Sequence, residues 1–164
     1  MIEIEKNFDL RPEDKERLIQ GAELIAKKTF TDVYYDSADF SLTTKDYWLR
    51  QRDGEWELKV PLNSKGMDRG ETDLYEELET EQEIVEELKI STENELSGEL
   101  RKKGIVPFAT ITTEREYYRK SDFNLDFDIV KDLNYTTFEA ELLVESPKEI
   151  PEAEKRIIDF AKER

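Results

Sequence analysis

The sequence predicts an α+β fold in which an eight-stranded antiparallel sheet closes into a barrel, or tunnel, with a charged interior and flanking helices. Three observations predict it. Eight segments have the pattern of strands and four have the pattern of helices. Many neighbouring strands are separated by short turns, which is typical of antiparallel hairpins. Several strands carry charged side chains on one face and apolar side chains on the other. The length suits a single domain spanning 1–164.

The N-terminal part is expected to contain one helix between two strands. Residues 1–8 alternate in polarity and predict a strand. Residues 11–28 predict a helix, because Pro12 suits a first helical turn and an apolar stripe follows. The stripe consists of Leu18, Ile19, Ala22, Ile25 and Ala26. Residues 30–36 are rich in aromatic residues and predict the second strand.

The next segment predicts a hairpin and one further strand. Residues 46–61 alternate in polarity on both sides of Asp53-Gly54. Because this pair of residues suits the tight two-residue turn, the two arms are expected to pair with each other. Residues 71–78 predict the fifth strand.

Two short helices are expected before the last strands. Residues 81–103 contain both of them. Thr92 and Glu95 have the spacing of a capping box, in which the two side chains satisfy each other's backbone groups. Gly104 is expected to end the second helix, since glycine adopts the left-handed conformation found at helix ends.

The C-terminal part predicts three strands and a final helix. The strands are expected at residues 108–119, 124–130 and 136–145. The helix is expected to begin at Pro151. Its apolar side would carry Ala153, Ile157 and Phe160.

Absent residue types restrict the chemistry. The chain has no cysteine and no histidine, which excludes disulfides, thiolate metal sites and imidazole catalysis. A catalytic site would therefore use carboxylates, lysine, arginine, tyrosine or a hard metal ion. No apolar run reaches membrane length, and the N-terminus does not resemble a signal peptide. We therefore expect a cytoplasmic protein with no membrane partner, present as a monomer or weak dimer.

The negative charge is unevenly distributed. The net charge is −16, so nucleic acid is not an expected partner, because proteins that bind it usually carry a basic stripe. Residues 71–99 hold twelve acidic side chains against Lys89 alone, whereas residues 45–70 are nearly balanced. The simplest interpretation of the acidic excess is a solubility surface. The local gathering of cations also suggests a pocket for an anion.

Pairs of like-charged residues, two positions apart, occur in four of the predicted strands. They are Glu3 and Glu5, Arg50 and Arg52, Asp126 and Asp128, and Glu139 and Glu141, while Lys59 shares a face with Glu57. Two arrangements fit this pattern. In an ordinary sandwich the charged faces would meet water. In the other, the charges line a lumen and the apolar faces pack outward against the helices. The repetition across four strands favours the second arrangement.

Charges that point inward need ligands to neutralise them. Six inward carboxylates would repel one another, and a buried unpaired charge is costly. Oxygen ligands without histidine or cysteine favour Mg²⁺ or Mn²⁺. The cations Arg50, Arg52, Lys59 and Arg115 would hold phosphate oxygens, with each arginine able to donate two hydrogen bonds. Carboxylates for a metal beside cations for phosphate predict a site for a polyphosphate chain.

Short charged motifs follow one another in a fixed order along the chain. They are EIEKN, WLRQR with WELK, the ER of TTEREYY, and the later DFD and EAE pairs. From residue 1 to about 160, this order resembles the CYTH superfamily of triphosphate tunnel metalloenzymes. The stretch DVYYDSADFSLTTKDYWLRQRDGEWELKVP is similar to the animal-type thiamine triphosphatases of that family. The resemblance implies an eight-stranded tunnel, a divalent cation, and hydrolysis or cyclisation of a triphosphate.

The resemblance also implies roles for individual side chains. The metal ligands would be Glu3, Glu5, Asp126, Glu139 and Glu141, with Asp128 as an outer member. The phosphate-binding cations would be Arg50, Arg52, Lys59 and Arg115. Other substrate contacts would come from Glu77, a further tunnel acid, and from Tyr34 and Trp48 near the organic end. Catalysis itself is expected to involve Glu3, Glu5, Arg52 and Lys59.

Two positions depart from the family pattern. The family motif is Glu-x-Glu-x-Lys, but Asn7 stands at the lysine position and Lys6 precedes it. By alternation Lys6 is expected to point away from the lumen, so the site would have one cation fewer. The sequence ends at Arg164, whereas the animal enzymes have a further C-terminal segment that contributes a lysine to the tunnel. Both departures are expected to reduce the rate of hydrolysis and the selectivity for thiamine more than they reduce binding of the phosphate groups.

The sequence therefore predicts a Mg²⁺- or Mn²⁺-dependent hydrolase of triphosphates. Its substrate would be thiamine triphosphate, tripolyphosphate or a nucleoside triphosphate. A water would attack the terminal phosphorus in line, and a glutamate or the substrate itself would accept the proton. Two alternatives stay open: cyclisation of ATP, as in class IV-type adenylate cyclases, and binding of a triphosphate or polyphosphate without turnover.

Overall fold

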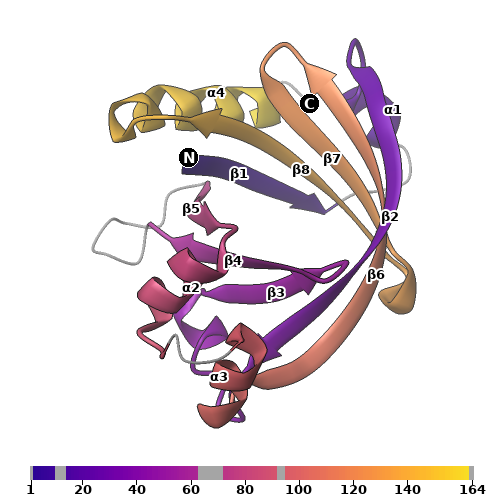
Figure 1. Ribbon diagram of the computed structural model, residues 1–164. Coiled ribbons are helices and arrows are strands. Elements are labelled where there is room, and N and C mark those ends of the chain that lie inside the picture. Colours follow the sequence, from indigo (N-terminus) through magenta and orange to yellow (C-terminus); the bar gives the residue numbers. More distant parts are fainter. Residues whose placement is uncertain (1, 10–13, 63–71, 92–94, 163–164) are drawn as a thin grey trace.

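Eight strands form one closed barrel in which all neighbouring strands run antiparallel (Figure 1). This computed structural model describes residues 2–9, 14–62, 72–91 and 95–162. The order around the barrel is β1-β5-β4-β3-β2-β6-β7-β8. The expected α+β fold with a closed eight-stranded sheet is therefore confirmed.

The barrel strands differ in length, and β2 and β6 are much longer than the others. The strands are β1 (Ile2–Asp9), β2 (Glu23–Asp36), β3 (Trp48–Arg52), β4 (Glu55–Pro61), β5 (Asp73–Leu78), β6 (Val106–Lys120), β7 (Phe123–Val130) and β8 (Tyr135–Val144). The helices are α1 (Asp14–Leu18), α2 (Glu81–Leu88), α3 (Leu96–Lys102) and α4 (Ile150–Lys162). Short 3₁₀ turns are η1 (Thr43–Lys45), η3 (Lys131–Leu133) and η4 (Pro147–Glu149).

The helix predicted over residues 11–28 is wrong beyond Leu18. Its expected start at Pro12 lies outside the described residues, and α1 has only five. Gly21 then adopts a φ of 75°, in the left-handed region, within the turn that precedes β2. From Glu23 onward the chain is strand β2, which pairs along its length with β6. The expected apolar stripe is therefore split: Leu18 is buried, whereas Ile25 is 58% exposed. Pairing with a long partner strand overrides the local helical pattern.

Turn and cap residues account for most other boundaries. Asp53 and Gly54 both have positive φ and form the predicted turn between β3 and β4. Helix α2 begins with a capping box in which Thr80 and Glu83 satisfy each other's backbone groups. Of the box predicted for α3, Thr92 lies outside the described residues. Glu95 is the N-cap of α3 and makes no side-chain capping hydrogen bond.

The apolar core lies outside the barrel, between the sheet and the helices. Helices α2 and α3 cover apolar residues of β3 and β4, among them Leu49 and Leu58. Helix α4 lies along β1 and β8 (Figure 1) and packs on Ile4 and Leu142. A third cluster joins Leu18 of α1 to aromatic and apolar residues of β7 and β8. Since the strands bury their apolar faces outward, their other faces must line the interior. This confirms the inverted arrangement.

No helix in the described part of the chain is both long enough and apolar enough to cross a membrane.

Candidate functional site

Two adjoining cavities occupy the inside of the barrel. One, of about 440 Å³, is lined by Glu3, Glu77, Asp126 and Glu141 among others, and we call it the carboxylate cavity. The other, of about 510 Å³, is lined by Phe30, Tyr34, Trp48 and Tyr75 among others, and we call it the aromatic cavity. The residues common to both are Arg50, Arg52, Lys59, Arg115 and Glu139. Because these side chains line both, the two cavities are direct neighbours inside the barrel.

Every side chain that the sequence analysis assigned to the site lines one or both cavities. The carboxylate cavity takes Glu3, Glu77, Asp126 and Glu141; the aromatic cavity takes Glu5, Tyr34, Trp48 and Asp128; Arg50, Arg52, Lys59, Arg115 and Glu139 line both. Asn7 also lines the aromatic cavity, whereas Lys6 lines neither. The geometry therefore brings the predicted residues together, although their individual roles stay predictions.

Three carboxylates converge closely enough to share one cation. Glu3, Glu139 and Glu141 each offer an oxygen, and these oxygens lie within 4.8 Å of one another. Burial raises the pKa of Glu3 to about 9, and Glu5, Glu77 and Glu141 add to the rise despite the opposing effect of Lys59. Burial and the neighbouring carboxylates thus disfavour the ionised form of Glu3. An all-oxygen donor set of this kind fits a hard divalent cation such as Mg²⁺ or Mn²⁺.

Lys59 stands between this cluster and the rest of the interior. Its Nζ lies 2.7 Å from Oε2 of Glu5, 2.9 Å from Oε2 of Glu3 and 3.7 Å from Oε1 of Glu77. Burial disfavours the ammonium ion, but the surrounding carboxylates outweigh burial and raise the pKa of Lys59 well above its usual range. Burial also raises the pKa of Glu5, to about 7, with Glu139 adding to the effect. Lys59 therefore stays charged, and three carboxylates surround its ammonium group.

The three arginines are held by carboxylates on neighbouring strands. Arg52 makes two hydrogen bonds to Asp32, of 2.9 and 3.0 Å. Arg115 makes two of 2.6 Å to Asp128 and also contacts Asp126. Paired hydrogen bonds of this kind fix the plane of a guanidinium as well as its position.

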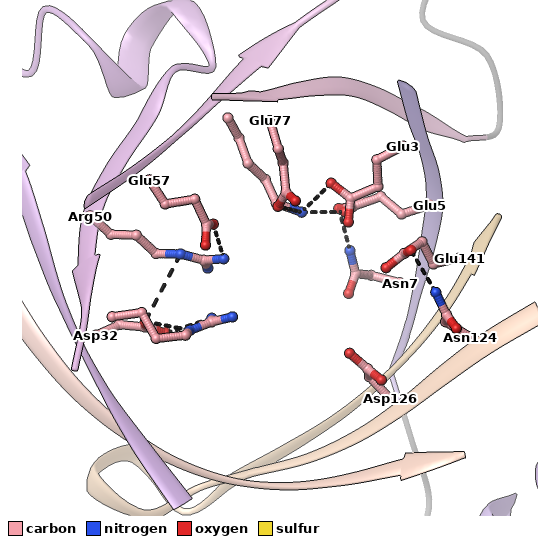
Figure 2. A network of polar contacts seen from close by, with 12 residues as sticks. Glu3, Glu5, Asn7, Asp32, Arg50, Glu57, Glu77, Asn124, Asp126 and Glu141 are labelled. Atoms are coloured by element: carbon pink, nitrogen blue, oxygen red, sulfur yellow. Dashed lines mark hydrogen bonds and ion pairs between the residues drawn. The ribbon is translucent and has the colours of Figure 1, made fainter. Parts of the chain in front are cut away.

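The third arginine faces both cavities. Arg50 forms an ion pair with Glu57, and its Nη1 lies 3.4 Å from the hydroxyl oxygen of Tyr34. Although burial opposes its charge, Glu57 leads the groups that raise the pKa of Arg50. Figure 2 shows Arg50, Glu57 and Asp32 on one side of the interior, facing Glu3, Glu5 and Glu141 across open space.

The register between neighbouring strands places each of these cations directly opposite a carboxylate. Four cross-strand neighbours join a cation to an acid: Arg50 with Glu57, Arg52 with Asp32, Lys59 with Glu77, and Arg115 with Asp128. Opposite charges placed directly across a strand pair attract each other. Each phosphate-binding candidate is therefore positioned before any ligand arrives.

The sequence analysis did not assign several interior residues to the site. Asp32, Glu57, Tyr75 and Asn124 line the cavities, and Asn124 donates a 2.9 Å hydrogen bond to Glu141. The signal in the sequence that could have identified them is the two-residue alternation of side chains along a strand. Each is two residues away from a predicted site residue on the same strand, so it shares that residue's face. Asn7 was singled out only as a departure, and its amide lies 3.3 Å from Oε1 of Glu5.

Comparison with known proteins gives a family and a fold. The family model described as the CYTH domain matches residues 1–163. The thiamine-triphosphatase of Homo sapiens is 32% identical over 174 residues, which cover 96% of this chain and 74% of that protein. The thiamine-triphosphatase of Macaca fascicularis is also 32% identical, over 173 residues, with the same coverage.

Solved structures share the architecture at lower identity. The PH1819 protein from Pyrococcus horikoshii OT3 superposes with a TM-score of 0.66 at 23% identity, covering 98% of this chain and 89% of that one. A protein from Hippeastrum, HpAC1, has a TM-score of 0.58 at 17% identity, covering 99% and 86%. It is described as a putative adenylyl cyclase with a dominant triphosphatase activity. At these identities the likeness shows the fold alone.

Proposed function

This chain belongs to the CYTH domain family, and from that premise we propose that it is a metal-dependent hydrolase of triphosphate-containing substrates. Thiamine triphosphate and inorganic tripolyphosphate are the first candidates, since the two curated relatives described above are both named thiamine-triphosphatase. The proposal depends on one observation: three converging carboxylates and four partly buried cations line the inside of the same barrel.

The four cations would bind the phosphate chain. Arg50, Arg52, Lys59 and Arg115 line both cavities, so a triphosphate lying across the shared region would contact all four. Because the arginines are already oriented by Glu57, Asp32 and Asp128, little reorganisation would accompany binding. Phosphoryl transfer depends mainly on positioning and charge stabilisation, which this arrangement supplies.

Glu3, Glu139 and Glu141 would hold the divalent cation. When bound, Mg²⁺ or Mn²⁺ would polarise the terminal phosphoryl group and offset the charge on its oxygens. The wider ligand set, with Glu5, Asp126 and Asp128, remains a prediction, and in the structure these three carboxylates contact Lys59 and Arg115. With no histidine in the chain, a buried glutamate or the substrate itself would accept the proton from the attacking water.

The test is phosphate release from tripolyphosphate, thiamine triphosphate and ATP with Mg²⁺, Mn²⁺ or Ca²⁺. We expect Glu139→Gln to lower kcat/KM by about 100-fold or more, because it removes one cation-binding charge. Arg115→Lys is expected to cause a loss of similar size, because lysine cannot reproduce the paired hydrogen bonds.

Matched variants on the surface control for folding. Glu114→Gln removes a carboxylate that pairs with Lys131 outside the cavities, and Arg156→Lys alters a surface arginine paired with Asp122. Both are expected to retain activity. Wild-type rates in folded Glu139→Gln and Arg115→Lys proteins would end the proposal.

The same screen separates the two alternatives. Chromatography of the ATP reaction would show cyclic AMP if the chain cyclises ATP. Tight tripolyphosphate binding with no turnover under any of the three cations would indicate a binding protein.

A further inference from the structure

A carboxylate holds the exposed tryptophan at the mouth of the aromatic cavity. Nε1 of Trp48 donates a 2.9 Å hydrogen bond to Oδ1 of Asp46. The hydroxyl of Tyr75, on β5, lies 3.1 Å from both carboxylate oxygens of Asp46. All three side chains line the aromatic cavity. Asp46 thus joins the start of β3 to β5, although β4 lies between these strands.

The backbone at Asp46 is itself fixed. Its φ is 65°, in the left-handed region, and its N–H donates to the carbonyl of Thr43 at the end of η1. Aspartate tolerates this conformation better than most residues. The preceding turn is anchored by the fully buried Asp36, which accepts 2.9 Å hydrogen bonds from the backbone of Leu42 and Thr43. The carboxylate therefore has a defined position before a ligand binds.

The tryptophan is placed where the organic end of a bound triphosphate would lie. Trp48 shares a strand face with Arg50 and is 37% exposed. Its ring meets Tyr34 edge to face, with centroids 6.2 Å apart, and Tyr34 contacts Arg50. A group attached to phosphates held by Arg50 would thus reach this aromatic wall.

The hydrogen bond from Trp48 to Asp46 also affects which ligand groups the aromatic rings of Trp48 and Tyr34 attract. A cation near an aromatic ring is drawn to the electron density of its face, most strongly for tryptophan. Donation of the indole N–H to a carboxylate polarises the ring and adds to that density. The same cavity is lined by further carboxylates, Glu5 and Asp73. Both effects favour a flat organic group with a positive charge over a neutral one.

We infer that Asp46 is a positioning residue that sets substrate specificity through Trp48. It favours triphosphates whose organic group is a planar aromatic cation over inorganic tripolyphosphate. This inference rests on the proposed function and adds to it a residue that positions the aromatic wall of the site.

The experiment compares kcat and KM for three substrates. Thiamine triphosphate carries an aromatic cation, ATP carries a neutral base, and tripolyphosphate has no organic group. The test variant is Asp46→Asn, since asparagine also tolerates the left-handed backbone. The control is Asp53→Asn, at another left-handed aspartate that lines neither internal cavity.

For Asp46→Asn we expect KM for thiamine triphosphate to rise, by up to about tenfold, because the indole would then donate to a neutral amide and its ring would attract a cation less strongly. The effect on ATP is expected to be smaller, and tripolyphosphate and the Asp53→Asn protein are expected to be unchanged. Equal losses for all three substrates would indicate a merely structural role and overturn the inference, as would no loss for any.

A double-mutant cycle tests the route through Trp48. Trp48→Phe keeps an aromatic ring but removes the hydrogen bond to Asp46. If Asp46 acts through the indole, adding Asp46→Asn to Trp48→Phe costs little more. If the losses from the two single substitutions add fully in the double variant, Asp46 does not act through Trp48 and the inference is contradicted.

A wild-type protein that hydrolyses none of the triphosphates would refute the proposed function and not this inference. Calorimetry would then compare binding of thiamine triphosphate and tripolyphosphate to the wild-type and Asp46→Asn proteins. A binding ratio unchanged by Asp46→Asn would overturn the inference, and a ratio shifted toward tripolyphosphate would support it.

Discussion

Alternation along single strands decides where each charged residue of the site lies. In β1, Glu3 and Glu5 line the cavities, while Ile4 between them is fully buried in the outer core. This parity is visible in the sequence, and it placed the predicted side chains in the interior. The partners could not be predicted in the same way. That Arg52 would meet Asp32 depends on the register between β2 and β3, which no local pattern encodes.

One residue-scale prediction concerns a carboxylate on the outside of the barrel. Glu116 accepts hydrogen bonds from Lys15 at 2.7 Å and Lys27 at 2.6 Å, and also from Tyr118. These hydrogen bonds lower the pKa of Glu116 to about 2. A carboxylate whose pKa is lower in the folded state stabilises the fold above its unfolded pKa. That stability is lost as the pH falls toward the folded value.

We therefore expect Glu116→Gln to reduce the free energy of unfolding by about 1 kcal/mol at pH 7, because partly exposed ion pairs are screened. The difference from wild type should shrink between about pH 4.5 and pH 2, where Glu116 of the wild type takes up its proton. Urea unfolding of both proteins across this range measures it. A difference that stays constant with pH would show that the ion pairs do not stabilise the fold.

At the scale of elements, the main discrepancy is the first half of β2. Residues 23–28 look helical because alanine, lysine and leucine are frequent there. They form a strand because β6 continues as far as Lys120 and offers backbone partners for them. Such pairing is long-range, so a local pattern cannot show it. The predicted hairpin, the two short helices and the last helix were found because their turn residues and apolar spacing are local signals.

Gly21 allows a test of this element. Its φ of 75° is strained for a residue with a Cβ, although an added Cβ would meet no atom within 4 Å. We expect Gly21→Ala to lower the free energy of unfolding by about 1 kcal/mol, with activity unchanged. Chemical denaturation gives the value. A continuous helix over residues 11–28 would give the opposite sign, because alanine stabilises a helix interior relative to glycine.

At the scale of the whole molecule, the arrangement of side chains is the reverse of that in a barrel with an apolar interior. The barrel packs its apolar faces outward under the helices and keeps its charged faces inside. The repeated like-charged pairs made this inversion predictable. The strand order was not, because it follows from how strands from both ends of the chain, such as β1 and β8, come together.

The inversion also concentrates four cations inside a protein of net charge −16, although carboxylates outnumber cations in the interior. Pairing with carboxylates orients these cations, and although burial opposes the charge of Lys59 and Arg115, the neighbouring carboxylates raise the pKa of both. A divalent cation at Glu3, Glu139 and Glu141 would reduce the repulsion between those carboxylates. The metal and the triphosphate would therefore favour each other's binding.

A crystal structure with Mn²⁺ and a non-hydrolysable imido analogue of tripolyphosphate tests this account most directly. The anomalous signal of manganese locates the metal independently of the protein coordinates. We predict one peak among the carboxylates of Glu3, Glu139 and Glu141, with the analogue's phosphates against Arg50, Arg52, Lys59 and Arg115. Manganese and analogue bound only on the outer surface, with the interior holding neither, would contradict it.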